Sequence, residues 1–276
     1  MPMNRKRAAE LGRETVRILE AGCYTTAAGE VVAIGDLVRR AVAGTRSYPP
    51  EQMLPAGGPG GRETRVEVVN ESTLAAARRL VEAGHRPAAL NFASAKHPGG
   101  GFLSGARAQE ESLARSSGLY TCLAGNPMYE RHRSQADPMY TSYAIYSPDV
   151  PIFRADDGAL LPAPYLCAFL TAPAVNAKVV LARDPGRRLE IRFAMAERVR
   201  RVLTIAALHG HDALVLGAWG CGVFGNDSQE VADLFCDALA SDFGGVFSRV
   251  VFAVLDWSED QHFIGPFLRA FGPPPA

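Results

Sequence analysis

The sequence lacks the features that mark several protein classes. Its five cysteines are odd in number and include no Cys-x-x-Cys pair, which argues against a disulfide framework and against structural zinc. No apolar run is long enough to span a bilayer, and the first residues are polar and basic. Basic and acidic residues both total 29, so no net charge favours nucleic acid or a membrane. These absences favour a soluble cytoplasmic protein that captures any polyanionic ligand locally.

The chain begins with a segment that we expect to form an extension, residues 1–62. A helix is predicted for residues 5–20, where apolar residues recur at helical spacing before a stop at Gly22. A hairpin follows at 23–34, and then a short helix begins at Asp36. A connector rich in proline and glycine leads to residue 62, so this part is predicted to pack on a second unit, residues 63–276.

From residue 63 the pattern alternates between strands and helices. We expect strands at 65–69, 88–92, 140–146, 150–154, 165–170, 213–216 and 250–255. Helices are expected at 71–83, from about 109, at 189–208, at 228–240 and at 260–271. The strands that follow one another in the middle, with a turn at Asp156-Asp157-Gly158, break the βαβ rhythm. The fold class is therefore α/β, with a mixed sheet between two helical layers.

A triple glycine, Gly99 to Gly101, precedes a Gln109-Glu110-Glu111 sequence at the start of a predicted helix. Glycines adopt positive φ and let several N–H groups converge on one anion. A Glu-rich first turn is usually a solvated helix start, but here a bound sugar would lie within reach of two carboxylates. Glycoside cleavage requires a carboxylic acid that protonates the leaving oxygen. Because a helix N-terminus favours the ionised form, such an acid would need desolvation or nearby phosphates to keep its proton.

A second glycine loop, residues 217–225, contains Gly220, Gly222 and Gly225 in a GxGxxG pattern. It comes too late in the fold for a dinucleotide-binding motif and is not followed by the Lys-Ser/Thr of a P-loop. Its backbone N–H groups could still hold a diphosphate, with Phe224 offering a flat face to a sugar or base or simply packing in the core. Both loops follow a buried strand, so we expect them to form one cleft at the carboxyl edge of the sheet.

Three further side chains near these loops have ordinary structural explanations. His97 adjoins the triple glycine beside a proline and is expected to be structural. Asp256 ends a strand, where it could face the cleft or cap the next turn. Cys221 lies between loop glycines, and the sequence offers no base partner that would make it a nucleophile.

The sequence Leu-Asn-Phe-Ala-Ser-Ala-Lys-His-Pro-Gly-Gly-Gly at 90–101, with Gln-Glu-Glu at 109–111, resembles the bacterial-type poly(ADP-ribose) glycohydrolases. The resemblance spans most of the chain and implies a macrodomain behind the N-terminal extension. It implies hydrolysis of the ribose–ribose O-glycosidic bond of poly(ADP-ribose), without a metal or cofactor. Poly(ADP-ribose), ADP-ribose and ADP-ribosylated proteins would be the partners, with no membrane or direct nucleic-acid binding.

The resemblance also implies roles for individual residues. Glu111 would be the general acid and then the base, Glu110 would orient the ribose, and Gln109 would fix the loop. Phosphate and distal ribose would be held by Gly99, Gly100 and Gly101. Gly220, Cys221, Gly222, Val223, Phe224 and Gly225 would wrap the diphosphate, with Phe224 against the distal ribose. Asn91 is the expected ribose contact, whereas Ser94 stands where macrodomains often carry a second asparagine.

We therefore expect an exo-acting, monomeric, cytoplasmic poly(ADP-ribose) glycohydrolase that releases ADP-ribose. Two alternatives remain open at this point. One is a non-hydrolytic ADP-ribose-binding macrodomain, against which the intact glutamate pair argues. The other is a hydrolase of mono-ADP-ribosyl proteins or O-acetyl-ADP-ribose. No local motif identifies the adenine pocket.

Overall fold

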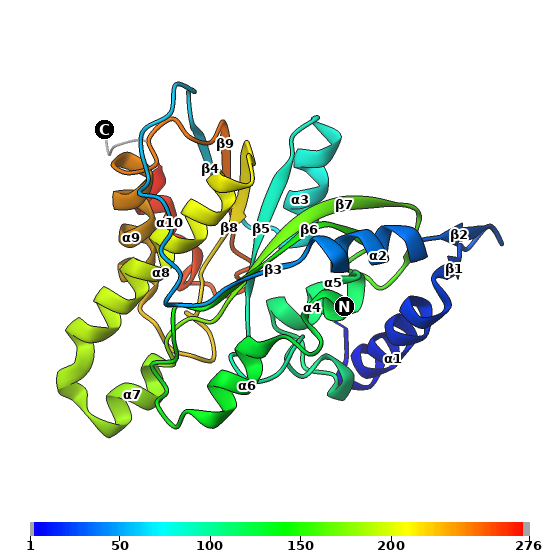
Figure 1. The fold of residues 1–276 in the computed structure, drawn as a ribbon, viewed down its shortest axis with the longest axis horizontal. Helices are drawn as coiled ribbons and strands as arrows, with labels where there is room; N and C mark the ends of the chain where they lie inside the picture. The colour runs from blue at the N-terminus through cyan, green and yellow to red at the C-terminus, as the bar shows by residue number, and fades with distance from the viewer. Residues whose placement is uncertain (1–2, 273–276) are drawn as a thin grey trace.

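The computed structural model describes residues 3–272 and contains a seven-stranded mixed sheet between two layers of helices (Figure 1). The strand order is β3-β6-β7-β5-β8-β9-β4, in which β7, β5, β8, β9 and β4 run parallel and β6 and β3 are each antiparallel to their neighbours. The strands are β3 (Arg46–Tyr48), β4 (Arg65–Val69), β5 (Pro87–Phe92), β6 (Ala144–Arg154), β7 (Leu160–Ala172), β8 (Ala213–Leu216) and β9 (Arg249–Ala253). This architecture confirms the predicted mixed α/β sheet.

Successive residues of the strands pack on opposite faces of the sheet, as the period of two requires. In β5, Ala88 and Leu90 belong to one core cluster, and Ala89 belongs to another. The first cluster is covered by α7 (Ala177–Arg183), α8 (Arg188–Leu208), α9 (Ser228–Ala240) and α10 (Ile264–Phe271). The second lies under α3 (Thr73–Glu82), α4 (Gln109–Ser116), α5 (Leu119–Leu123) and α6 (Pro127–Ser134). Both faces of the central strands are thus buried, which explains their continuous apolar sequences.

The N-terminal segment forms the predicted helix and hairpin. Helix α1 (Arg5–Ala21) is capped by the Asn4 side chain, which accepts a hydrogen bond from Arg7 N, and it ends at Gly22 with φ 71°. A hairpin of β1 (Cys23–Thr25) and β2 (Val31–Ala33) leads to α2 (Gly35–Gly44). This segment has its own small core, which includes Phe153 of β6.

Strand β3 was not predicted, because three residues are too few to show an alternating pattern. It pairs with β6 and makes residues 46–48 an edge strand of the central sheet. The N-terminal segment therefore contributes to the main sheet as well as packing on it. The boundary between residues 1–62 and 63–276 stays a prediction, and residues 1–2 and 273–276 of these ranges lie outside the described residues.

The prediction of two strands at 140–146 and 150–154 is wrong in its boundaries. One strand, β6, runs from Ala144 to Arg154 and pairs with β7 along its length, with a register shift between Ser147 and Val150. The Pro148-Asp149 dipeptide reads as a turn, but Asp149 adopts φ 45° inside an irregularity of the ladder and the strand continues. Residues 140–143 are not a strand, since Tyr140 has φ 54°.

The carboxyl ends of β5, β8, β9 and β4 lie at one edge of the sheet, because these strands are parallel and adjacent. The first glycine loop follows β5 and leads through a short 3-10 helix, η1 (Phe102–Ser104), into α4. The second follows β8 and leads into α9. A second 3-10 helix, η2 (Pro185–Arg187), precedes α8. Of the helices within residues 3–272, none is both long and apolar enough to cross a membrane.

Candidate active site

A cavity of about 500 Å³ opens at this edge of the sheet. The end of β5, the start of α4 and the loop after β8 form its walls, together with the ends of β9 and β4. The predicted site residues that line it are Gln109, Glu110, Glu111, Gly220, Gly222, Val223 and Phe224. The second glycine loop and the glutamates that follow the first loop therefore line one cavity, whereas the triple glycine itself does not.

The other predicted site residues lie outside the lining of this cavity. Four of them are not part of its lining: Asn91, Gly99, Gly100 and Gly101. A different cavity of about 530 Å³, beside the start of α9, is lined by Cys221 and Gly225. The sequence could not separate these two groups, because neighbouring residues of a tight loop point in different directions.

The triple glycine makes room for the carboxylates of α4. A Cβ on Gly100 would lie 2.2 Å from Glu111 Oε1 and 2.9 Å from Glu110 Oε2, so no side chain fits there. Gly99 and Gly100 have φ values of 70° and 58°, which disfavour any other residue. Gly101 N donates a hydrogen bond of 2.9 Å to Glu111 Oε1. The loop thus holds a carboxylate of the chain itself, and its predicted phosphate contact stays a prediction.

Glu110 and Glu111 are both buried at the base of the cleft. Burial raises the pKa of Glu110 to about 8, and the nearby charge of Glu111 adds to this, whereas a hydrogen bond of 2.7 Å from Ser94 N opposes it. Glu110 Oε1 and Glu111 Oε2 are buried and have no hydrogen-bond partner among residues 3–272. The desolvation that a catalytic acid requires is therefore present at this pair, where burial raises the pKa of Glu110.

Gln109 connects α4 to the end of β5. Its Oε1 accepts a hydrogen bond of 2.9 Å from Phe92 N, and its Nε2 donates to Leu90 O at 2.7 Å and to Thr73 Oγ1 at 3.1 Å. Strand β8 pairs with β5 only as far as Ala89. Beyond that residue, the Gln109 side-chain amide forms the hydrogen bonds to the β5 backbone that a neighbouring strand would form. This supports the predicted role of Gln109 in fixing the loop.

Asn91 lies in β5 opposite Thr171 of β7, and no part of it is exposed. Its Nδ2 donates to Thr171 Oγ1 at 3.2 Å, whereas its Oδ1 has no partner among the described residues. Ser94 Oγ accepts hydrogen bonds from Lys96 N and His97 N. The Ser94 hydroxyl therefore stabilises the turn before the triple glycine, and the Ser94 amide donates a hydrogen bond to Glu110 Oε2.

The second loop leaves several backbone donors unused. Within residues 3–272, no protein group accepts a hydrogen bond from the N–H groups of Gly222, Val223 or Phe224. Gly220 has φ 76°, and a Cβ there would lie 2.5 Å from the Ala174 Cβ. Three successive free N–H groups at the mouth of a cleft are suited to an anion.

Phe224 is half-buried and lines the cavity. Its ring centroid lies 6.1 Å from that of Tyr140, which in turn lies 5.6 Å from the ring of His132. His132 is buried between Ala95 O and Thr141 Oγ1, and burial lowers its pKa to about 4, so it is neutral at pH 7. No sequence signal identifies Tyr140 or His132, because both are far from the glycine loops along the chain.

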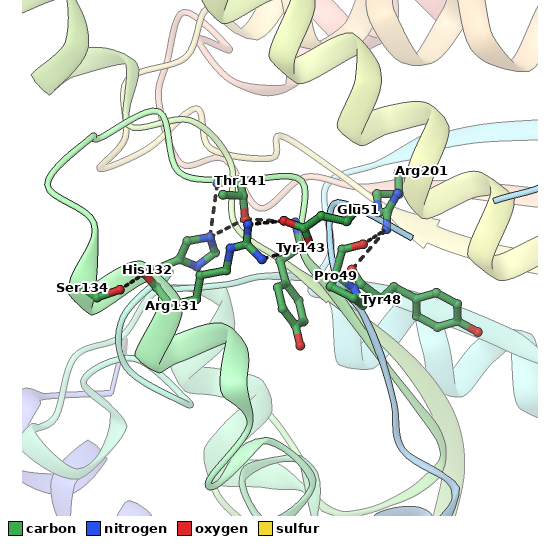
Figure 2. Close-up of polar contacts among 9 residues, drawn as sticks. All are labelled: Tyr48, Pro49, Glu51, Arg131, His132, Ser134, Thr141, Tyr143 and Arg201. Atoms are coloured by element: carbon green, nitrogen blue, oxygen red, sulfur yellow. Dashed lines mark hydrogen bonds and ion pairs between the residues drawn. The ribbon is translucent and has the colours of Figure 1, made fainter. Parts of the chain in front are cut away.

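Figure 2 shows how the Pro-rich connector after β3 is attached to two helices. Arg131 of α6 forms an ion pair with Glu51 of the Pro-rich connector. Arg201 of α8 donates hydrogen bonds to the carbonyls of Tyr48 and Pro49 at the start of that connector. The connector therefore links α6 and α8.

The remaining end of the cavity is mostly apolar. It is lined by the apolar residues Leu74, Leu255 and Phe263 and by two acidic residues, Glu71 and Asp156. These residues come from four separate segments, so no local motif could have identified them. Asp256, which follows β9, accepts hydrogen bonds from residues 258, 263 and 264 and from the Ser258 hydroxyl, and it caps the turn before α10. Within residues 3–272, no cluster of three His, Cys, Asp or Glu side chains could hold a metal ion.

Comparisons with known proteins point to one family. A family model described as microbial-type PARG, catalytic domain, matches residues 12–155. The search of curated proteins found no match.

Solved structures are similar over almost the whole chain. Poly(ADP-ribose) glycohydrolase from Thermomonospora curvata is 51% identical with a TM-score of 0.91, covering 96% of this chain and 99% of that one. A structure of that protein with the inhibitor ADP-HPD matches with 49% identity, a TM-score of 0.88 and the same coverage. The poly(ADP-ribose) glycohydrolase from Deinococcus radiodurans, in complex with ADP-ribose, is 45% identical with a TM-score of 0.81, covering 87% and 99%.

Proposed function

Because the chain belongs to the microbial-type poly(ADP-ribose) glycohydrolases, which are glycosidases, we propose that it hydrolyses the ribose–ribose O-glycosidic bonds of poly(ADP-ribose). The observation that carries this proposal is the buried pair of Glu110 and Glu111 at the base of the cleft, one of which keeps a proton near neutral pH. A pair that retains one proton has the acid that glycoside cleavage requires.

The ligand would extend along the cavity from the glutamates to the apolar end. Its diphosphate would lie on the free N–H groups of residues 222–224, and its distal ribose would pack against Phe224. The adenine would occupy the apolar end between Leu255 and Phe263, where it buries the most apolar surface. Asn91, Gly99 to Gly101, Cys221 and Gly225 would support these contacts from behind the cavity lining.

Glu111 would carry out the proton transfers. The Gly101 amide fixes its Oε1, and its Oε2, which has no partner among residues 3–272, is available to a ligand. The proton that the pair retains would pass from Glu110 to Glu111, which donates it to the departing 2′-oxygen as positive charge develops on the anomeric carbon and then removes a proton from the attacking water. Glu110, ionised after this transfer, accepts a hydrogen bond from a ribose hydroxyl and so orients the sugar.

The finer features of this activity are part of the same proposal. The enzyme would act from the polymer end and release ADP-ribose, because one cavity of about 500 Å³ suits one unit of the polymer. We also propose that the protein is monomeric and cytoplasmic and that ADP-ribosylated proteins carry its substrate. The odd number of cysteines supports the cytoplasmic location.

The test is release of ADP-ribose from automodified polymerase by wild type and by Glu111→Gln, with ADP-ribose affinity measured in parallel. We expect the variant to bind ADP-ribose normally and to turn over at least about 100-fold more slowly, since general acid catalysis contributes this much. Glu82→Gln, an exposed carboxylate of α3, is the matched control and should retain full activity.

Other outcomes identify the alternatives. If wild type and variant both bind ADP-ribose and neither cleaves any conjugate, the protein is a non-hydrolytic binding domain. If single protein-linked ADP-ribose units or O-acetyl-ADP-ribose are hydrolysed while polymer remains intact, the protein is a hydrolase of those substrates. Either result would overturn the assignment of Glu111 as the acid in polymer cleavage.

A further inference from the structure

The N-terminal helix α1 lies against the segment that carries both glutamates, residues 99–116. In Figure 1 α1 lies beside α4, and the two helices are in contact. Arg5 Nε donates a hydrogen bond of 3.1 Å to Ser104 O. A Cβ on Gly105 would lie 2.2 Å from Arg5 O, so the backbones of helix and segment meet directly. The first turn of α1 thus holds the residues that follow the triple glycine.

The middle of α1 packs on the same turn through a glycine. Gly12 is buried inside the helix, where glycine costs about 0.5–1 kcal/mol relative to alanine. A Cβ at this position would lie 2.7 Å from Phe102 O, which explains why the helix has no side chain there. Phe102 directly follows Gly101, whose amide holds the carboxylate of Glu111. A shift of α1 would therefore move Phe102, and with it the Gly101 amide that holds the carboxylate of Glu111.

The second half of α1 holds the other end of the segment. Thr15 Oγ1 donates a hydrogen bond to Arg115 O in the last turn of α4. The same carbonyl accepts a bond of 3.2 Å from Arg154 Nε, and the buried Arg154 guanidinium forms an ion pair of 3.2 Å with Glu14. Arg115 itself is one turn beyond Glu111 on the same helix. Both ends of the segment are therefore attached to one rigid element.

We propose that α1 positions the catalytic segment, with Gly12 and Thr15 as positioning residues for the carboxylate of Glu111. This inference rests on the proposed glycosidase function. The diphosphate loop and the apolar end of the cavity belong to other elements of the fold, after β8, β9 and β4. Loosening α1 therefore slows the chemical step and leaves ADP-ribose binding in place. If α1 only stabilised the fold, loosening it would not lower kcat while leaving the Kd for ADP-ribose unchanged.

The test compares two threonine variants, each of which loses one hydrogen bond from a side-chain hydroxyl to a backbone carbonyl. Thr15→Val removes the bond to Arg115 O, and Thr64→Val removes a bond of 2.7 Å to Phe247 O at the opposite, amino edge of the sheet. We expect Thr15→Val to lower kcat about tenfold, since small misplacements of a catalytic group have large effects. Its ADP-ribose Kd should stay unchanged, Thr64→Val should keep the wild-type kcat, and Thr15→Ser, which retains the hydroxyl, should restore turnover.

A readout independent of activity accompanies the kinetics. Hydrogen exchange of the Gly101 amide should become about tenfold faster in Thr15→Val and stay unchanged in Thr64→Val, because that amide holds Glu111. Equal kcat in the two valine variants at equal melting temperature, with equal Gly101 exchange, would overturn the proposal. If wild type fails to cleave polymer, the proposed function fails, and the exchange measurement still decides whether α1 fixes the segment.

Discussion

The two glycine-rich loops of the cleft follow neighbouring buried strands, yet their backbone N–H groups have different partners. In the first loop, Gly101 N donates to Glu111 and Gly100 N donates to the His97 carbonyl. In the second, the successive N–H groups of residues 222–224 have no acceptor within residues 3–272. The first loop is occupied by the chain itself, and the second leaves its donors for a ligand.

The comparison shows that glycine serves two different purposes at one site. At Gly100 it makes space for carboxylates, because a Cβ would lie within 3 Å of an oxygen of each glutamate. At Gly222 nothing lies within 4 Å of such a Cβ, so what the loop gains there is an open backbone. A run of glycines therefore does not by itself identify a phosphate site.

The largest effect should follow from Gly100→Ala. The new Cβ would meet both carboxylates and require φ of 58°, so Glu111 must move. We expect turnover of poly(ADP-ribose) to fall by about 100-fold or more, with ADP-ribose affinity near that of wild type. Gly29→Ala also requires a positive φ, of 84°, but nothing lies within 4 Å of its Cβ, so this variant should keep full activity. Turnover equal to that of Gly29→Ala would show that Gly100 is not needed for the carboxylates.

The reciprocal change is Gly220→Ala in the second loop. Its Cβ would lie 2.5 Å from Ala174 and 2.6 Å from Asn226 Nδ2, so the loop must shift its free N–H groups. We expect the ADP-ribose Kd to rise about tenfold, equivalent to about 1.4 kcal/mol. At saturating polymer, turnover should fall far less than in Gly100→Ala. Calorimetry and steady-state kinetics measure both quantities, and a pure loss of kcat would break the proposed division between the loops.

A smaller effect concerns stability and pH. Because the folded-state pKa of Glu110 is raised from 4.5 to about 8, the protein loses stability as pH rises through that range and the buried carboxyl ionises. Glu110→Gln has no such ionisation. We expect its free energy of unfolding to exceed that of wild type by an amount that grows from pH 5 to pH 9, up to a few kcal/mol.

Denaturant unfolding of both proteins across this pH range measures the difference. The exposed Glu82→Gln should show no trend. A difference between Glu110→Gln and wild type that stays constant with pH would mean that Glu110 is ionised in the folded protein throughout.

The smallest effect should come from Val223→Ala. The side chain is 83% exposed, whereas the proposed ligand contact of this residue is its backbone N–H. We expect the melting temperature to stay unchanged and the free energy of unfolding to shift by no more than about 0.5 kcal/mol. ADP-ribose affinity should change by less than about threefold, since only peripheral apolar contact is lost. A larger loss of affinity would assign binding energy to the valine side chain.

Much of the fold could be predicted where local signals agree with packing. Helix α9 has the predicted bounds, 228–240, because Asp227 caps its first turn and an apolar face follows. Strands β4 and β8 also have the predicted bounds. Strand β6 was divided incorrectly because Pro148-Asp149 has the local signal of a turn, and the long pairing with β7 overrides it. Helices α5, α6 and α7 were not predicted, since five to eight residues show little periodicity.

The sequence by itself determined the chemistry of the site: two glycine loops after buried strands, and a Gln109-Glu110-Glu111 run close to the first. Spacing along the chain limits where these residues can lie, so their shared cleft was predictable. Only the tertiary structure decided which backbone donors stay free, how deeply the two glutamates are buried, and how α1 attaches to α4. These properties depend on contacts between segments about a hundred residues apart, such as Thr15 with Arg115, and no local pattern encodes them.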